Sequence, residues 1–339
     1  MNTDLGIDRI AQPVLVTGAN GFLGTHLVRR FIRAGIRPRA FILAGTPVPA
    51  EWHDAVEIVR GDITDAKSVR TAAQGCRTIL HLAALVTDWG TREAHRRVTL
   101  EGTENVFAAA AQVRARVVLV SSVVVYADRI GAGPCHEGLG FGRPRGPYGW
   151  AKQRQELTAQ RYRGRVDYSI VRPANIYGPG CGPWLRDVVE VLRMRVLPTL
   201  VNGGNGNAGL VHVENVADLV LLAAWHPRAL GEAFNAADEL PVTWRTYIGD
   251  IARLAGTRPP GSTPAWLALP TAALMEWIWG AFGIRHRPPV TREALALVGN
   301  DNQFPQRKAR EVLGYRPRIG YAEGMDTVAR SLKAESSAQ

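Results

Sequence analysis

The sequence predicts an α/β fold: a doubly wound parallel sheet with a smaller, mostly helical substrate lobe at the C-terminal end. Two observations predict it. Short runs rich in Val, Ile and Leu alternate with helical stretches through the first half of the chain, and after Pro173 this rhythm gives way to Gly- and Pro-rich loops and helical segments. Strands that alternate with helices form parallel sheets covered on both faces.

The expected elements follow the chain in order. Six strands are expected at Pro13–Thr17, Arg39–Leu43, Val56–Val59, Thr78–Leu82, Val117–Ser121 and Tyr168–Arg172. The helices expected between them are Thr25–Ala34, Ala66–Ala73, Thr99–Gln112 and Ala151–Tyr162, and a later helix and strand are expected at Asn215–Trp225 and Ala233–Asn235. Six strands of this kind suffice for a Rossmann-type dinucleotide-binding sheet. We therefore expect residues 1–173 to form that domain, with late pieces near 208–240, and residues 174–207 and 241–339 to form the substrate-binding lobe.

Composition narrows the class of protein. The chain has 339 residues, of which 46% are hydrophobic and 21% charged, which is ordinary for a globular protein. Its net charge of +11 favours anionic partners, but the basic residues are scattered without interleaved aromatics, so no nucleic-acid partner is expected. Three cysteines without a C-x-x-C pair predict neither disulfides nor a zinc site, and we expect no metal and a cytoplasmic protein.

A glycine cluster follows the first expected strand. Gly18, Gly21 and Gly24 fall as G-x-x-G-x-x-G between that strand and the first helix. Such glycines permit a tight turn and a close approach of the backbone to a pyrophosphate, which meets free N–H groups at the helix start. The position predicts a dinucleotide site.

A tyrosine and a lysine stand four residues apart at the start of the fourth of these helices. Tyr148 and Lys152 therefore share one helical face, where the ammonium would lower the pKa of the phenol and allow acid–base catalysis near neutral pH. The end of the fifth strand supplies a hydroxyl, from Ser121 or Ser122, that could polarise a carbonyl.

The chain resembles the extended short-chain dehydrogenase/reductases of the NAD-dependent epimerase/dehydratase superfamily. The resemblance is carried by Thr17–Gly24, Gly61–Asp65, His81–Ala84 and Arg172–Pro179, together with the Y-x-x-x-K motif. One departure is Thr99, which stands where the family has an asparagine.

The resemblance implies roles for individual residues. Catalysis falls to Ser122, Tyr148 and Lys152. Binding of NAD(P) falls to Gly18, Asn20, Gly21, Phe22, Leu23, Gly24, Asp62, Ile63, Leu82, Ala83, Ala84, Tyr148, Lys152, Pro173 and Asn175. Substrate contacts are expected from Ser122, Val123, Tyr148, Asn175 and Trp277. A homodimer through the helices at 99–112 and 151–162 is typical of such proteins.

The choice of nicotinamide cofactor leans to NADP. No Asp or Glu follows the second strand in Leu43–Thr46, where an NAD enzyme binds the ribose diol. Arg39 and Arg60 could approach a 2′-phosphate, although both could also be solvated surface charges.

The later motifs bear on the substrate. Val211–Asp218, Phe234–Asp238 and Asp301–Tyr315 resemble the 3β-hydroxysteroid dehydrogenase-like branch. This implies an oxidoreductase that interconverts a secondary alcohol and a ketone on an apolar, steroid-, polyketide- or acyl-like molecule. The alternatives are a nucleotide-sugar epimerase or dehydratase and a non-catalytic nucleotide-sensing scaffold.

One segment of the C-terminal part is almost wholly apolar. Ala265–Phe282 carries only Glu276 as a charge and is interrupted by Pro270. It is expected to be a lid over an apolar pocket, a core or dimer helix, or a membrane-surface helix with a basic flank. The last interpretation would make the protein peripheral to a membrane.

Overall fold

The structure is a computed structural model that describes residues 5–193, 199–284 and 286–337. Its main sheet has seven parallel strands in the order β10-β6-β5-β4-β1-β2-β3. These are β1 (Val14–Thr17), β2 (Arg39–Ile42), β3 (Glu57–Arg60), β4 (Thr78–His81), β5 (Arg116–Val120), β6 (Tyr168–Pro173) and β10 (Ala233–Ala236). The predicted fold class is confirmed. The strand order reverses between β1 and β4, and ligands of such sheets bind outside the carboxyl ends of the strands at that point.

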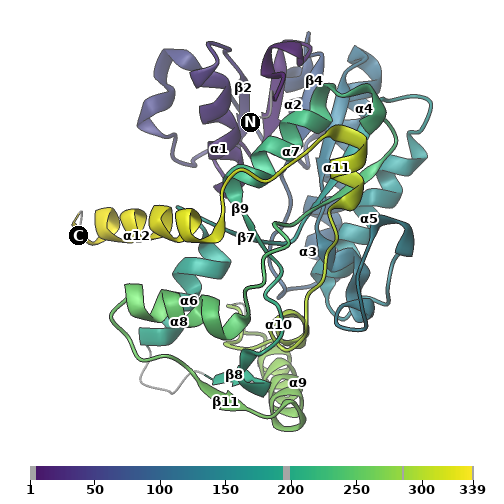
Figure 1. Cartoon of the computed structure of the whole chain (residues 1–339). Coiled ribbons are helices and arrows are strands. Elements are labelled where there is room, and N and C mark those ends of the chain that lie inside the picture. Colours follow the sequence, from purple (N-terminus) through teal and green to yellow (C-terminus); the bar gives the residue numbers. More distant parts are fainter. Residues whose placement is uncertain (1–4, 194–198, 285, 338–339) are drawn as a thin grey trace.

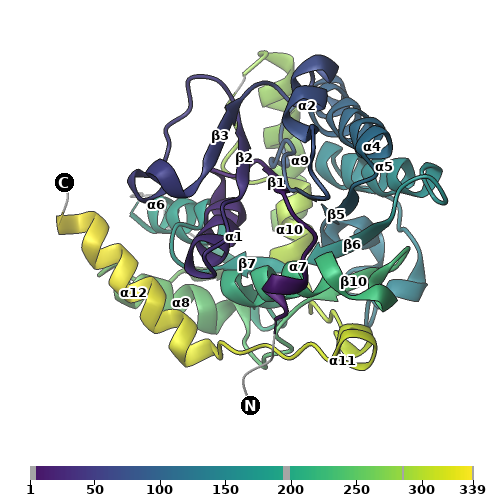
Figure 2. The same cartoon turned by 90° about the horizontal axis from the view of Figure 1, so that it is seen from above.

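Helices cover both faces of the sheet (Figure 2). One face carries α1 (Phe22–Arg33) and α7 (Val213–Trp225), and the other carries α2 (Ala66–Ala73), α4 (Gly102–Val113) and α5 (Pro147–Arg161). Alternate strand residues point to opposite faces. Accordingly, Val14 and Val16 pack with α1 and α7, whereas Leu15 packs with α2 and α4.

The substrate lobe lies beyond the carboxyl edge of the sheet (Figure 1). It contains α6 (Asp187–Arg193), β8 (Thr199–Val201), α8 (Trp244–Leu254), β11 (Gly261–Thr263), α9 (Ala265–Ala281) and α10 (Arg292–Val298). Leu185, Trp244 and Tyr247 are buried in a core of its own, where β8 pairs with β11. The strands β7 (Asn175–Tyr177) and β9 (Leu210–His212) pair with each other between the two parts.

The last segments of the chain return to the sheet domain. The helix α11 (Arg307–Leu313) contacts β10, and Leu313 and Tyr315 are buried in the same core as α7. The sequence had suggested that all of residues 241–339 belong to the lobe. The structure differs, because these apolar side chains cover the edge of the sheet at β10. The helix α12 (Tyr321–Ser337) packs Val328 into the lobe core.

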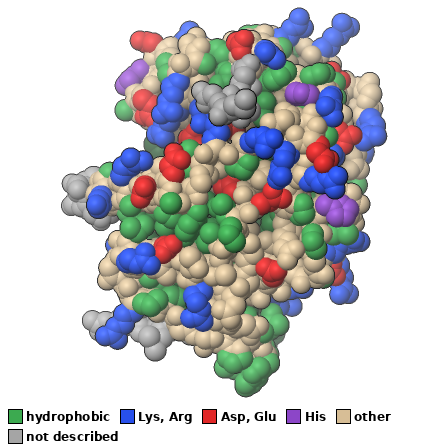
Figure 3. Space-filling model, in the orientation of Figure 1, with side chains coloured by type: hydrophobic (Ala, Val, Ile, Leu, Met, Phe, Trp, Pro, Cys, Tyr) green, Lys and Arg blue, Asp and Glu red, His purple; other side chains and the backbone are tan. Residues whose placement is uncertain are grey.

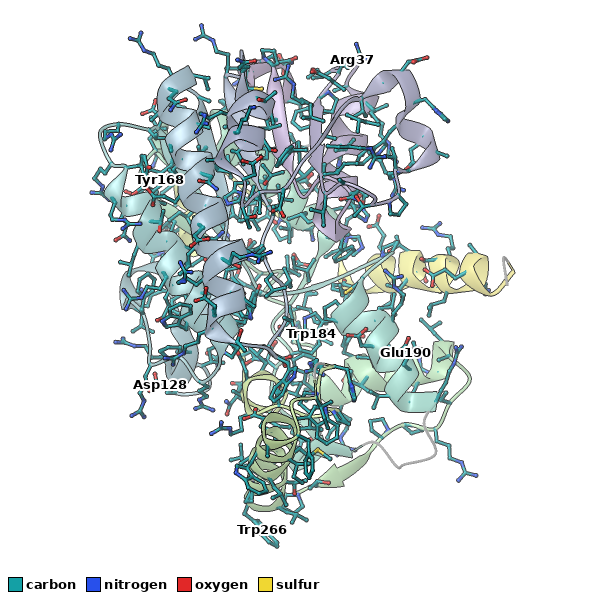
Figure 4. All side chains as sticks on the ribbon, turned by 180° about the vertical axis from the view of Figure 1, so that it is seen from behind. Arg37, Asp128, Tyr168, Trp184, Glu190 and Trp266 are labelled. Atoms are coloured by element: carbon teal, nitrogen blue, oxygen red, sulfur yellow. The ribbon has the colours of Figure 1, made fainter. Side chains whose placement is uncertain are left out.

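The apolar segment forms α9, and the interpretation of this segment as a core helix is wrong. Ala272 is its only buried residue, since the helix projects from the lobe and packs on α10. Trp266, at the tip in Figure 4, is 75% exposed, Trp277 is 68% exposed and Phe282, just after the helix, is 78% exposed. Apolar side chains accordingly form the lower end of the surface in Figure 3. None of the described helices is long and apolar enough to cross a bilayer.

Candidate active site

The glycine loop is a cradle that side chains would fill. Gly18 has φ +65, and a Cβ there would lie 3.0 Å from the Ala83 nitrogen; a Cβ on Gly24 would lie 2.3 Å from the Gly18 carbonyl oxygen. The helix α1 follows with Gly21 as its N-cap and no side chain bonded to the N–H groups of its first turn. These N–H groups can therefore receive the phosphates of a dinucleotide.

The loop after β2 is held between the glycine loop and β3. The Asn20 amide donates to the Thr46 hydroxyl at 2.9 Å and to the Pro47 carbonyl at 3.2 Å. Arg60, at the end of β3, donates to the Thr46 carbonyl at 3.1 Å and is exposed. Arg60 therefore stands at the edge of the sheet where the ribose of the adenosine half would lie.

The proposed role of Arg39 in binding a 2′-phosphate is not supported. Its guanidinium donates to the carbonyls of Ala72 and Gln74, each at 2.7 Å, and pairs with Glu57 at 2.8 Å. The side chain thus ties β2 to β3 and to the end of α2. Arg39 begins β2, whereas Arg60 ends β3 at the carboxyl edge of the sheet, and this explains why the two arginines have different partners.

The three predicted catalytic side chains meet at the carboxyl ends of β5 and β6. Ser122 accepts from the Val124 N–H at 3.3 Å, and its side chain acts to lower the pKa of Tyr148. The Lys152 ammonium lies 5.9 Å from the centre of the Tyr148 ring and donates to the Val120 carbonyl at 2.9 Å. Tyr148 opens α5, so its hydroxyl is presented at the helix start while Lys152 stands one turn further in.

A buried polar chain connects Lys152 to the glycine loop. Lys152 donates to Gln155 at 2.9 Å, and Gln155 donates to the Thr103 hydroxyl at 2.9 Å. Thr103 also lies 3.0 Å from His81, whose other ring nitrogen lies 2.9 Å from the Thr17 hydroxyl. The chain fixes the ends of β1 and β4 and the turn of α5 that carries Lys152 relative to one another.

The protonation equilibria differ from the sequence-based expectation. Burial lowers the pKa of Lys152 to about 8 and that of His81 to about 3. The pKa of Tyr148 is raised, chiefly by burial and also by the nearby Glu293 carboxylate, rather than lowered by Lys152. The Lys152 ammonium donates to the Val120 carbonyl and to Gln155 and lies 5.9 Å from the centre of the Tyr148 ring.

The other predicted cofactor residues lie around the same edge. Phe22 and Leu23 begin α1, Leu82 and Ala83 donate their N–H groups to Thr17 at 3.2 Å, and Ala84 follows them. Asp62 accepts from the Thr64 N–H at 2.8 Å, and Ile63 is buried against Gly102. Pro173 ends β6, buried beside β10.

Two predicted substrate residues have other surroundings. The Asn175 amide, 3% exposed, donates to the Ala208 carbonyl at 2.7 Å. Trp277 faces solvent on α9. Val123 is buried directly behind Ser122. Asn175 therefore stabilises the junction between β7 and the loop before β9.

Three residues near Tyr148 were not identified from the sequence as parts of the site. His95, in α3 (Arg92–His95), is fully buried with its ring centre 6.4 Å from that of Tyr148, and neither ring nitrogen has a hydrogen-bond partner among the described residues. Burial lowers the pKa of His95, and the charge of Lys152 lowers it further. Thr99, in the wide helical turn Arg96–Glu101, accepts from the Leu85 N–H at 3.1 Å and so fixes the loop after β4. Glu293 of α10 accepts from the Gly149 N–H at 2.8 Å. Only Thr99 was marked by a motif.

The arrangement fits a nicotinamide dinucleotide. The glycine cradle and the uncapped start of α1 suit the pyrophosphate, and the reversal of strand order lies between the glycine loop and the end of β4. Among the described residues, no group of three or more His, Cys, Asp or Glu side chains is placed to hold a metal ion.

Comparisons with known proteins agree with this geometry. Residues 14–237 match the NAD dependent epimerase/dehydratase family. A 4-hydroxy-2-methyl-3-oxo-4-farnesyl-3,4-dihydroquinoline-1-oxide ketoreductase of Stigmatella aurantiaca is 28% identical, over 93% of this chain and 95% of that protein. A 3-beta-hydroxysteroid dehydrogenase of Mycolicibacterium neoaurum is 32% identical, over 96% and 91%.

A solved structure shares the whole fold. MoeE5 in complex with UDP-glucuronic acid and NAD superposes with a TM-score of 0.71 at 25% identity, covering 96% of this chain and all of that one. The family match spans the glycine loop, the strand ends and the Ser122, Tyr148 and Lys152 site described above. The chain therefore belongs to the NAD-dependent epimerase/dehydratase family, the extended short-chain dehydrogenase/reductases, whose members bind NAD(P).

Proposed function

We propose that this protein is an NAD(P)-dependent oxidoreductase that interconverts a secondary alcohol and a ketone on an apolar substrate. The observation that carries the proposal is the placement of Ser122 at the end of β5 and of Tyr148 and Lys152 one turn apart on α5, with the Lys152 ammonium 5.9 Å from the centre of the Tyr148 ring and bonded to the Val120 carbonyl. When bound, the nicotinamide accepts a hydride from the alcohol carbon or donates one to the carbonyl carbon.

The protein supplies the proton. In ketone reduction, the Tyr148 hydroxyl gives its proton to the carbonyl oxygen while Ser122 donates a hydrogen bond to the same oxygen. In alcohol oxidation, the phenolate of Tyr148 takes the hydroxyl proton. A positioned acid–base group of this kind contributes about 10²–10⁴ in rate. Lys152, held by Val120 and Gln155, would bind the nicotinamide ribose.

The lining between the two parts of the molecule favours an apolar substrate. Phe22 and Trp184 each pack partly buried against both the sheet core and the lobe core, so these aromatic rings lie where the two parts meet. Figure 4 shows Trp184 in this central position. The Asn175 amide, which the resemblance assigns to a diphosphate in sugar enzymes, is already bonded to the Ala208 carbonyl. Both curated relatives named above also carry names of enzymes acting on apolar ketones or alcohols.

The experiment is an assay of the purified protein with NADPH or NADH and a panel of apolar ketones, with UDP-glucose in parallel. Cofactor oxidation that depends on an apolar ketone supports the proposal. Epimerisation of the nucleotide sugar with no net change in the cofactor would instead establish the epimerase alternative. Cofactor binding without turnover of any compound would favour a nucleotide-sensing scaffold.

We further propose NADP as the preferred cofactor. No acidic side chain follows β2 in Leu43–Thr46, and Arg60 is anchored to the Thr46 carbonyl beside the glycine loop. An arginine presents a guanidinium fork that matches phosphate geometry.

We also propose that α9 rests on an anionic phospholipid surface. Its one acid, Glu276, is 17% exposed and is paired at 2.6 Å with Arg292, which also donates its N–H to the same carboxylate. The exposed face is therefore apolar, on a chain of net charge +11. Tryptophans near both ends suit the head-group region of a bilayer. The exposed face of α9 is one helix wide, and a stable dimer interface buries about 800 Å² on each partner. The narrow face therefore favours a lipid surface over a second copy of the chain.

A further inference from the structure

The first turn of the catalytic helix has a capping requirement that its own sequence does not meet. The N–H groups of a first helical turn have no partner within the helix and are usually met by an N-cap side chain. In α5 the N-cap is Gly146, which has no side chain, and Pro147 follows it. The N–H groups of Tyr148 and Gly149 therefore need an acceptor from elsewhere.

Glu293 supplies that acceptor from the substrate lobe. Its carboxylate accepts from the Gly149 N–H at 2.8 Å. A Cβ on Gly146 would lie 1.9 Å from the second carboxylate oxygen of Glu293, so the absence of a side chain at the N-cap leaves the space that the carboxylate fills. Glu293 is 144 residues away from Gly149 and is 8% exposed.

We infer that Glu293 is a positioning residue, which caps the first turn of the catalytic helix from the substrate lobe and so places its carboxylate beside Tyr148. The inference rests on the proposed role of Tyr148 as the acid–base group. Glu293 stands on α10, which packs on α9, two residues after Thr291, which donates to Asp88 in the loop after β4. Movement of the lobe would therefore be transmitted to the residue that moves the proton.

The charges around Glu293 determine when it is ionised. Asp88 and Glu276 both disfavour its charge, but Asp88 is paired with Arg287 and Glu276 with Arg292. Arg145 lines the same small cavity as Glu293, and Tyr148 faces it from α5.

Burial raises the pKa of Glu293 to about 7, and its second carboxylate oxygen has no hydrogen-bond partner among the described residues. The group therefore changes charge near neutrality. The negative charge of Glu293 raises the pKa of Tyr148.

The signs of two pH effects follow. In alcohol oxidation the phenolate of Tyr148 is the base, so the rate rises with pH as the phenol ionises. Removing the charge of Glu293 lowers that pKa and moves the rise to lower pH. For stability, the folded pKa of Glu293 lies above its usual value of 4.5, so its contribution is complete below that pH and is lost as the pH rises through about 7.

The experiment compares Glu293→Gln with Glu311→Gln, a control that removes the charge of an exposed acid on α11 paired with Arg307. For Glu293→Gln we expect the rise of kcat/KM for alcohol oxidation to move to lower pH by about one unit, as for a charge a few ångströms away. The fall in melting temperature between pH 5 and 8 should be smaller than in the wild type. Glu293→Asp keeps the charge but is shorter, so we expect the wild-type pH profile with a lower kcat.

The outcomes separate the two proposals. A wild-type enzyme without alcohol or ketone turnover would overturn the proposed function, while the melting comparison would still report the titration of Glu293. A Glu293→Gln profile and melting curve that both superimpose on those of the wild type would overturn the inference. If Glu293→Gln does not fold, Glu293→Asp tests the inference instead. A wild-type pH profile of kcat/KM with a lower kcat would support it, and a shifted pH profile would contradict a role for the charge.

Discussion

At the scale of single residues, the site depends on two opposing neighbours of Tyr148. Burial and Glu293 raise the pKa of Tyr148, whereas the Ser122 side chain lowers it. Lys152, which the Y-x-x-x-K spacing correctly placed on the same helix, is held away by the Val120 carbonyl. Spacing along a helix fixes which residues share a face, but it does not show which carbonyl or carboxylate will come from another strand or lobe. For that reason Ser122, Tyr148 and Lys152 could be predicted and Glu293 and His95 could not.

Tyr148→Phe should lower kcat by about 10²–10⁴ because it removes the oxygen that carries the proton. The dissociation constant for NADPH, measured by fluorescence titration, should stay within about twofold, since the glycine loop and Lys152 remain. Tyr162→Phe is the matched control. Tyr162 directly follows α5, and its hydroxyl donates to Glu104 of α4. Equal loss of activity in both variants would contradict the role of Tyr148.

Arg60→Ala should weaken NADPH binding by about tenfold or more, the range for a lost hydrogen bond to a charged group. NADH has no 2′-phosphate, so its affinity should change little. Fluorescence titration of both cofactors measures this, with Arg37→Ala as the control because Arg37 is exposed at the opposite end of β2 (Figure 4). An equal effect on both cofactors would rule out recognition of the phosphate by Arg60.

At the scale of elements, hydrophobic periodicity was enough for the sheet and not for α9. The strands β1, β4, β5 and β6 are buried on both faces, and continuous apolar runs of that length have few other solutions. A helix that is apolar on all sides can be a core helix, a lid or a membrane-surface helix, as the three interpretations of Ala265–Phe282 showed. Only the exposure of Trp266 and Trp277 excluded the core, because exposure depends on what the lobe packs against.

The double variant Trp266→Ser and Trp277→Ser should lower binding to vesicles of phosphatidylglycerol and phosphatidylcholine at least tenfold, because indoles anchor helices at the head-group level. Cosedimentation measures it, with Leu230→Ser, an exposed apolar residue away from α9, as the control. High salt should weaken wild-type binding. Loss of self-association in the double variant, without wild-type binding to vesicles, would instead assign α9 to a second copy of the chain.

At the scale of the whole molecule, the outer face of α4 and α5 is available for the homodimer that the family resemblance implies, and we propose that dimer here. A groove of about 770 Å³ crosses this face, on the side of α5 away from the Tyr148 hydroxyl. It is lined by Arg96, Leu100, Glu101, Glu104, Arg154, Leu157, Thr158, Gln160 and Arg161. The mixture of apolar and oppositely charged side chains suits a self-complementary interface.

Leu157→Glu should convert the dimer to a monomer, because the new charge would be buried without a partner. Leu157 is 38% exposed, and Leu230→Glu, at 40% exposed, is the matched control on another face. Sedimentation velocity measures the change. A wild-type monomer at micromolar concentration would contradict the proposed dimer.

The central claim, hydride transfer to an apolar ketone with Tyr148 as the proton donor, is tested most directly by isotope transfer. The protein is incubated with an apolar ketone and NADPH or NADH that carries deuterium at the transferable position of C4, and the alcohol product is analysed by mass spectrometry. We predict one deuterium on the carbinol carbon with the wild type and a loss of about 10²–10⁴ in the rate of its appearance with Tyr148→Phe. Deuterium that stays on the cofactor, with none on the carbinol carbon of any alcohol formed, would contradict the account.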